Sequence, residues 1–196
     1  MAEEKLTENV FANQTFMWDW KCIAPNFYIM QGFKYASAAT ITKVVVTMGK
    51  IGTPAGYVWA EIWDSKVAGS SHISGNSSDQ TENDVSAYGA APGEQVTCNF
   101  NINRPVYPGA LAQWYIVLAS DVAVVVDADF ILTGAGVNDY ADGSFSLISG
   151  AFVYNDKAAN DMVFELHGIV DGGDTEELLF ASPFKNPFNT PIQGAT

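Results

Sequence analysis

The stretch Tyr-Val-Trp-Ala-Glu-Ile-Trp at residues 57–63 alternates between two kinds of side chain. In a β-strand, side chains two positions apart share one face. One face would be aliphatic and would comprise Val58, Ala60 and Ile62. The other would carry Tyr57, Trp59, Glu61 and Trp63. A strand with two such different faces predicts a sheet that covers an apolar core with its aliphatic side.

The same period of two recurs along most of the chain on both sides of this strand. Strands are predicted at residues 15–22, 28–35, 40–48, 57–63, 95–102, 112–120, 123–132, 144–154 and 162–170. Turn-rich segments lie at 49–56, 104–110 and 134–143, and the polar segment 64–93 is expected to be loop with short pieces of structure. Turn signals spaced by roughly 8–12 residues are typical of antiparallel sandwiches or barrels. No helical stripe is visible, which disfavours parallel folds that need crossover helices.

The sequence divides into three parts. Residues 1–14 are predicted to be a polar N-terminal arm with one helical turn at 3–10, and residues 15–170 to be one sandwich domain. Residues 171–196 combine an acidic linker with an extended arm. Prolines followed by apolar side chains recur in this arm at Pro183, Phe184, Pro187, Phe188, Pro191 and Ile192. Because proline favours a stiff, extended chain, the arm is expected to dock on a partner, unless it frays or folds back on its own domain.

Composition restricts the function. The 196 residues are 48% hydrophobic and 16% charged, with a formal net charge of −13. Such a chain should fold around a core, and it should be repelled by nucleic acids and by anionic membranes. No apolar run is long enough to span a membrane, and the N-terminus lacks the pattern of a secretory signal. We therefore expect a chain that is made and kept in a cytoplasm, or released from it by lysis. Its two cysteines suit a reducing compartment, and a bridge between Cys22 and Cys98 is an open alternative.

Several short stretches together resemble a known family. They are QGF at 31–33, ITKV at 41–44, GTPAG at 52–56, AEIWD at 60–64, VTCNF at 96–100, WYIVL at 114–118, YADGS at 140–144 and MVFELHG at 162–168. This succession resembles jelly-roll modules of bacterial surface and bacteriophage proteins, which look like carbohydrate-binding modules. The resemblance implies a jelly-roll β-sandwich and carries over no catalytic residue. Surface modules of this type normally have a signal peptide and an anchor, so we expect a bacteriophage virion protein that assembles in the host cytoplasm.

Catalytic motifs are not evident in the sequence. His72 and His167 have no metal-ligand spacing, and an isolated histidine in a strand is usually structural. Asp127 and Asp129 could share one face of a strand, but solvated loop ends explain them as well. Asp139 and Asp142 are weak candidates for a Ca²⁺ site, since Ca²⁺ prefers hard oxygen ligands. We predict no enzyme activity and no cofactor.

The aromatic face of the strand at 57–63 is a candidate platform. If its aliphatic row points inward, Tyr57, Trp59 and Trp63 point outward, which is costly unless they are covered. The cover could be a loop or arm of the same chain, a neighbouring subunit, or a sugar stacked on the rings. A second row, at Phe16, Trp18 and Trp20, leaves the same three alternatives open.

These observations favour a structural protein of a bacteriophage particle, such as a capsid decoration, spike or tail-associated component. Its partners would be other virion proteins, copies of itself and a glycan in one alternative. That alternative is a carbohydrate-binding adhesion module, and a more distant one is a polysaccharide hydrolase.

Overall fold

The computed structural model describes residues 2–9, 16–20, 28–66, 77–90, 93–102, 104–122, 130–137, 140–141, 143–148, 153–157 and 160–171. Its strands are β1 (Glu4–Asn9), β2 (Phe16–Trp20), β3 (Tyr28–Phe33), β4 (Ala39–Ile51), β5 (Tyr57–Trp63), β6 (Asn83–Asp84), β7 (Glu94–Asn99), β8 (Val106–Tyr107), β9 (Trp114–Ser120), β10 (Phe130–Val137), β11 (Phe145–Ile148), β12 (Tyr154–Asp156), β13 (Asn160–Met162) and β14 (Phe164–Val170). A single 3₁₀ turn, η1 (Val85–Ala87), interrupts this series in the described part of the chain. The protein is therefore all-β, as its sequence predicts.

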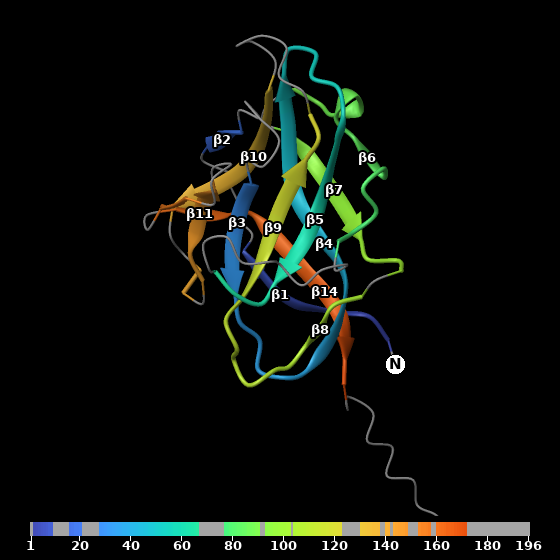
Figure 1. Ribbon diagram of the computed structural model, residues 1–196, viewed down its shortest axis with the longest axis vertical. Coiled ribbons are helices and arrows are strands. Elements are labelled where there is room, and N and C mark those ends of the chain that lie inside the picture. The colour runs from blue at the N-terminus through green and yellow to red at the C-terminus, as the bar shows by residue number, and fades with distance from the viewer. Residues whose placement is uncertain are drawn as a thin grey trace, which may run out of the picture.

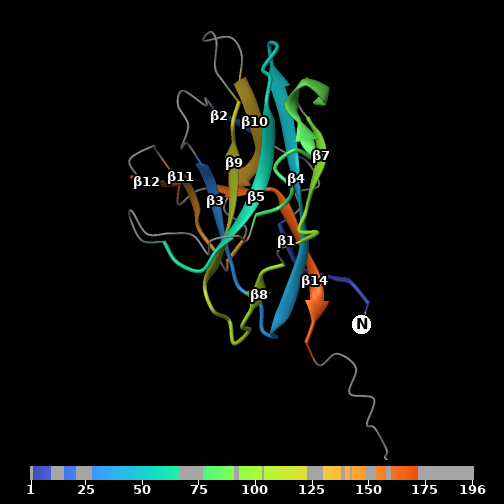
Figure 2. The ribbon, with the colours of Figure 1, turned by 45° about the vertical axis from the view of Figure 1, so that its right-hand side comes forward.

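The strands form two sheets, seen in Figure 1 and from a second side in Figure 2. The eight-stranded sheet has the order β1-β14-β4-β10-β13, with β2 paired to β10 and with β7 and β8 paired to β4. The six-stranded sheet has the order β12-β11-β3-β9-β5-β6. All pairings between these strands are antiparallel. Figure 2 shows β3, β9 and β5 in one layer and β4, β7 and β14 in the other, as in a β-sandwich.

The main core lies between the sheets. The six-stranded sheet contributes Ile29, Phe33, Val58, Ala60, Ile62, Ile116 and Leu118. The eight-stranded sheet contributes Ile41, Val44, Val46, Met48, Val96, Cys98, Phe164 and Leu166. The aliphatic row of β5 has no solvent exposure, which confirms the inward direction predicted from its alternation.

A bulge in β4 lets this long strand place buried side chains in the core on both sides of Thr42. The register of β4 against β14 slips by one residue between Ile41 and Lys43. Because Thr42 is the extra residue, Ile41 and Val44 both point inward although they are three positions apart, and neither is exposed. A strict alternation would have turned one of them to the outer face.

Several predicted segments are corrected by the structure. Residues 144–154 are not one strand, because β11 and β12 pair antiparallel with each other. Residues 4–9 form β1 and not a helical turn, because they pair with β14 and bury Leu6 in the main core. Residues 134–137 extend β10 and do not belong to a turn. Gly134 and Ala135 pair with β2, and Gly136 pairs with β13, so backbone pairing on both sides overrides the weak strand propensity of glycine.

Candidate functional site

The outer face of the six-stranded sheet carries one row of side chains that crosses five strands. Asp156, Ser146, Met30, Val117 and Glu61 are successive cross-strand partners on β12, β11, β3, β9 and β5. Directly opposed residues on one face are close enough for their side chains to interact. The row has an acidic residue at each end and the apolar residues Met30 and Val117 in the middle.

A small second core occupies the middle of this face. Met30, Trp63, Val117 and Ile148 are buried together, and Tyr28 and Tyr115 pack against them. The ring centroids of Tyr28 and Trp63 are 5.7 Å apart with an interplanar angle of 60°. Burial raises the pKa of both tyrosine hydroxyls, with smaller contributions from nearby acidic groups. The middle of the outer face of this sheet is therefore buried under the chain's own side chains.

This second core changes the interpretation of the predicted aromatic platform. Trp63 points outward from the main core, as predicted, but only 1% of it is exposed. Its ring is in contact with the chain's own side chains, so it is not a free stacking surface. Tyr57 and Trp59 remain half-buried, and they are the part of the predicted platform that a ligand could reach.

Glu61 fixes the orientation of both tryptophans on β5. The indole Nε1 of Trp59 donates a hydrogen bond of 2.9 Å to Glu61 Oε1, and Nε1 of Trp63 donates one of 2.9 Å to Oε2. Both indoles are i±2 neighbours of the glutamate on the same face of the strand. Because both carboxylate oxygens accept from ring N–H groups, Glu61 positions the two rings.

Lys66 closes the other end of the row. Its ammonium donates a hydrogen bond of 3.0 Å to Ser146 Oγ and forms an ion pair with Asp156. Ser146 Oγ in turn donates to Asp156 Oδ1 at 2.6 Å. The Lys66 hydrogen bond is the main reason that the pKa of the Asp156 carboxyl is lowered. Ser146 has no solvent exposure, so its hydroxyl is not accessible to a substrate.

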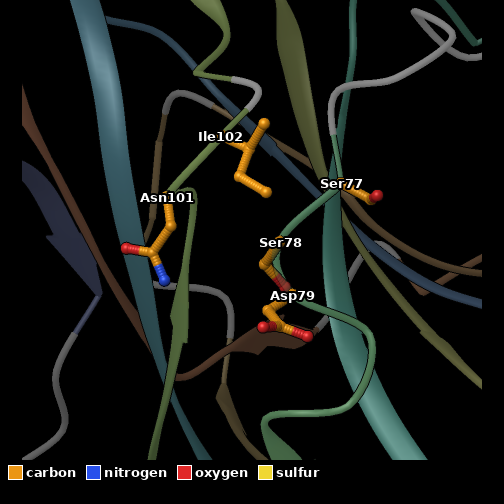
Figure 3. Close-up of a pocket in the computed structure, with 5 residues that line it drawn as sticks. All are labelled: Ser77, Ser78, Asp79, Asn101 and Ile102. Atoms are coloured by element: carbon orange, nitrogen blue, oxygen red, sulfur yellow. The ribbon is translucent and has the colours of Figure 1, made fainter.

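A shallow pocket of about 200 Å³ lies beside β5, and Figure 3 shows its lining. Ser77, Ser78 and Asp79 form one wall, and Asn101 and Ile102 face them. The backbone N–H of Ala60 donates to Ser78 Oγ at 3.0 Å. The pocket contains a single ionisable side chain, so its lining does not bring an acid and a base together.

That ionisable side chain, Asp79, accepts hydrogen bonds within its own loop. Asp79 Oδ1 accepts hydrogen bonds of 2.9 Å from the backbone N–H and from the hydroxyl of Thr81. These bonds lower the pKa of the Asp79 carboxyl, as in an Asx turn. The carboxylate therefore shapes the loop.

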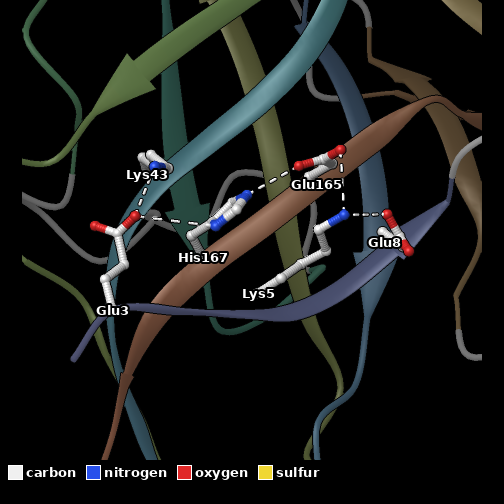
Figure 4. Close-up of polar contacts among 6 residues, drawn as sticks. All are labelled: Glu3, Lys5, Glu8, Lys43, Glu165 and His167. Carbon is white, nitrogen blue, oxygen red and sulfur yellow. Dashed lines mark hydrogen bonds and ion pairs between the residues drawn. The ribbon is translucent and has the colours of Figure 1, made fainter. Parts of the chain in front are cut away.

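Ion pairs on one face of the eight-stranded sheet link the N-terminal residues Glu3 and Lys5 to β4 and β14, as Figure 4 shows. The carboxylate of Glu3 lies 2.6 Å from Lys43 Nζ, and Glu165 lies 3.0 Å from His167 Nε2. Lys5 Nζ lies 3.3 Å from Glu165. The hydrogen bond from Lys43 is the main reason that the pKa of the Glu3 carboxyl is lowered, and the hydrogen bond with His167 is the main reason that the pKa of the Glu165 carboxyl is lowered.

His167 thus has carboxylates near both ring nitrogens. Nε2 lies 3.0 Å from Glu165, and Nδ1 lies 3.9 Å from Glu3. The side chain is 16% exposed and sits between two strands. This position is that of a residue that holds strands together, in line with the structural role predicted for a lone strand histidine.

A buried polar contact links the two sheets, and the sequence pattern did not predict it. Gln31 on β3 and Asp161 on β13 are both fully buried. Gln31 Nε2 donates to Asp161 Oδ1 at 3.1 Å, and Gln31 Oε1 accepts from the backbone N–H of Met162 at 2.8 Å. The backbone N–H of Tyr140 donates to Asp161 Oδ2 at 3.1 Å. The buried carboxylate is therefore satisfied within the fold.

Cys98 is a free, fully buried thiol, so the alternative of a bridge to Cys22 is not realised. Burial raises the pKa of the Cys98 thiol to about 12, and a thiol of that kind is unreactive. Within the described residues, no group of three or more His, Cys, Asp or Glu side chains could hold a metal ion.

Other predicted residues lie outside the described part of the chain. They are Cys22, His72, Asp127, Asp129, Asp139, Asp142, Pro183, Phe184, Pro187, Phe188, Pro191 and Ile192. The strand that carries Phe16, Trp18 and Trp20 is described as β2, but the placement of these three side chains is not.

No model of a known protein family matches the chain, and no curated protein matches it. Among the described residues, no helix has the length and hydropathy needed to cross a membrane.

Proposed function

We propose that this chain is a structural protein of a bacteriophage particle, with a jelly-roll sandwich as its body and arms that attach it to its neighbours. Its role would be that of a capsid decoration, spike or tail-associated component. The resemblance of its strand and turn sequences to jelly-roll modules of bacteriophage proteins is what supplies the bacteriophage context.

One observation carries the proposal of a passive building block. Several of the charged side chains that the structure describes are used in ion pairs between segments of the fold, such as Glu3 with Lys43 and Lys66 with Asp156. Acid–base or nucleophilic catalysis needs converging groups beside a space for the substrate. The pocket beside β5 instead holds Asp79 as its single ionisable group.

The C-terminal sequence adds support. The Pro-Phe segment between Pro183 and Ile192 places apolar side chains on a stiffened chain, and such a segment loses little entropy when it binds a groove. Large apolar side chains of this kind are the usual anchors of protein interfaces. An arm with these properties suits a subunit that must be held in an assembly.

The test is incorporation into particles. Deletion of residues 181–196 is expected to leave the circular dichroism spectrum of a sandwich unchanged and to abolish incorporation into purified particles. A control with Lys185→Ser should be incorporated normally, because a single surface charge contributes little to attachment. Normal incorporation of the deleted chain, or a full-length chain that stays monomeric and never enters a particle, would refute the proposal.

A carbohydrate-binding adhesion module is a second candidate, favoured by one specific observation. Trp59 is half-buried on the outer face of β5, and its ring is held in one orientation by the hydrogen bond to Glu61. A pre-oriented ring is a suitable surface for the C–H face of a sugar. A glycan array tests this idea: binding that persists unchanged in Trp59→Ala would remove this platform from consideration.

A further inference from the structure

Exposed aliphatic side chains are concentrated in one short segment of the sandwich. Of the five exposed large hydrophobic residues in the described chain, three lie within residues 102–111. They are Ile102, Val106 and Leu111, which are 91%, 61% and 57% exposed. Single exposed aliphatic residues need no explanation, but three in one connection between β7 and β9 suggest a surface that is covered by something else.

This segment is rigidly attached to the sandwich. Tyr107 has no solvent exposure. Its hydroxyl accepts a hydrogen bond of 2.9 Å from the backbone N–H of Tyr35 and lies 2.7 Å from the carbonyl oxygen of Ala112. Its ring packs edge-on against Trp114, with centroids 5.3 Å apart. The backbone that carries Val106 and Leu111 is therefore held in place by the contacts of Tyr107.

The turn that carries Leu111 is held in an uncommon conformation. Gly109, Ala110 and Leu111 have φ values of +77°, +55° and +56°, and the last two residues have side chains that disfavour this region. The backbone N–H of Leu111 donates to Tyr35 O at 3.1 Å. A Cβ at Gly109 would lie 2.5 Å from the backbone nitrogen of Ala38, so only glycine fits there. Backbone strain of this kind is concentrated at functional sites.

A row of three side chains on the outer face of the eight-stranded sheet includes Val106, which precedes Gly109 of this turn by three residues. Ile169 on β14 pairs with Thr40 on β4, and Thr40 pairs with Val106 on β8. Ile169 and Thr40 are half-buried, while Val106 is exposed. We call Thr40, Val106, Leu111 and Ile169 the acceptor patch.

The C-terminal segment leaves the sandwich beside this patch. The backbone N–H of Asp171 donates to Ala38 O at 2.9 Å, and Ala38 is the residue against which Gly109 packs. β14 and β8 are neighbours of the same strand β4, so their axes are about 10 Å apart at this end. Figure 1 shows β14 ending at the same end of the molecule as β8. Residues 172–182 follow, and an extended connector of that length spans up to about 36 Å.

We propose that the acceptor patch of one copy binds the Pro-Phe segment, residues 183–192, of a second copy. This inference rests on the proposed function, since it names the partner to which the arm attaches. Phe184, Phe188 and Ile192 would cover Val106, Leu111 and Ile169, and the prolines would keep the segment extended across them. Each copy donates an arm and receives one at the same end, so reciprocal exchange gives a twofold contact that closes as a dimer.

Photo-crosslinking of the full chain tests the contact. Light copies carry a photoreactive phenylalanine analogue at position 184, and isotopically heavy copies carry the natural sequence. The expected crosslinks join position 184 of light chains to residues 104–112 or 164–171 of heavy chains. Crosslinks that map to other parts of the heavy chain, or that join light chains only to themselves, would overturn the inference.

A matched pair of variants in the heavy chain measures the contribution of the patch. Val106 and Val153 are both 61% exposed, and only Val106 belongs to the patch. Val106→Ser is expected to lower the crosslink yield roughly tenfold, as for the loss of an anchor worth about 1.4 kcal/mol, and Val153→Ser to leave it unchanged. Equal yields for the two variants would overturn the inference.

A second variant guards against misfolding. Leu111→Asn removes the apolar side chain while supplying a residue that tolerates positive φ, so the turn should be retained. It should lower the crosslink yield with no loss of thermal stability, and an unchanged yield would count against the patch. If the truncated chain fails to enter particles while the crosslinks map elsewhere, the proposed function stands and this inference falls.

Discussion

Gln31 and Asp161 join the two sheets through a hydrogen bond of 3.1 Å between Gln31 Nε2 and Asp161 Oδ1, although neither residue is exposed to solvent. Buried polar pairs cost free energy unless all their groups are satisfied. Here the amide oxygen of Gln31 accepts from Met162 N–H and the second carboxylate oxygen accepts from Tyr140 N–H. The pair therefore fixes how β3 and β13 sit relative to each other.

Gln31→Leu should destabilise the protein by about 2–4 kcal/mol, because it leaves the Asp161 carboxylate and the Met162 N–H buried with fewer partners. Urea unfolding followed by fluorescence measures the change. Gln95→Leu on the exposed part of β7 is the matched control, and it should change stability by less than about 0.5 kcal/mol. Similar effects for both variants would show that the buried pair has no special role.

A second prediction concerns the pH dependence of β1. The pKa of the Glu3 carboxyl is lowered in the folded protein mainly by its hydrogen bond with Lys43, and the pKa of the Glu165 carboxyl mainly by its hydrogen bond with His167. Groups with lowered folded pKa values stabilise the fold above their unfolded pKa, about 4.3 for glutamate, and this contribution is lost as pH falls through the folded pKa. The attachment of β1 should therefore weaken below about pH 4.

The groups that face these carboxylates come from each strand packed around them. Lys43 on β4 and His167 on β14 face Glu3, while Lys5 on β1 and His167 face Glu165. Because Glu3 and Lys5 are well exposed, high salt should weaken the same contacts. The NMR signals of Leu6 and Thr7 should broaden or shift toward random-coil positions at pH 3 before the core unfolds. Native shifts for both residues at pH 3 would contradict this prediction.

The sequence predicted the core well because its signal is local. The alternation in β5 predicted both its boundaries and its inward face, with Val58, Ala60 and Ile62 all buried. It could not predict the second core, since the burial of Trp63 depends on Met30 and Val117 from other strands. A period of two fixes the side of the sheet on which a residue lies, and only the register of neighbouring strands determines what covers it.

Other features were out of reach for related reasons. The strand character of residues 4–9 comes from pairing with β14, and only Leu6 marks it in the sequence. The β4 bulge shifts the phase at Thr42, which a strict alternation rule misreads. The contact between Gln31 and Asp161 joins residues 130 positions apart, so no local pattern could reveal it.

A third prediction separates the two tryptophans of β5. Trp63→Ala should cost about 3–5 kcal/mol of stability, because it empties the centre of the second core. Trp59→Ala should cost clearly less, about 1–2 kcal/mol, since Trp59 is only half-buried. Equilibrium unfolding in guanidinium chloride measures both. If the two variants were equally stable, Trp63 would not be the anchor of this face, and the burial of its ring would have another origin.

A fourth prediction follows from the state of Cys98. Burial raises the pKa of its thiol to about 12, and the thiolate, not the thiol, is the reactive form. In a Cys22→Ser variant, which retains Cys98 as its single cysteine, a thiol reagent at pH 8 should therefore react very slowly with the native protein. Labelling should rise with urea along the same curve as unfolding, because Cys98 lies in the main core between the sheets and is reached only when they separate.

The thiol count of the unmodified chain under non-reducing conditions should be two, as expected without a bridge. Rapid labelling in native buffer would mean that the sheets open locally at β7, and it would place the least stable part of the sandwich there.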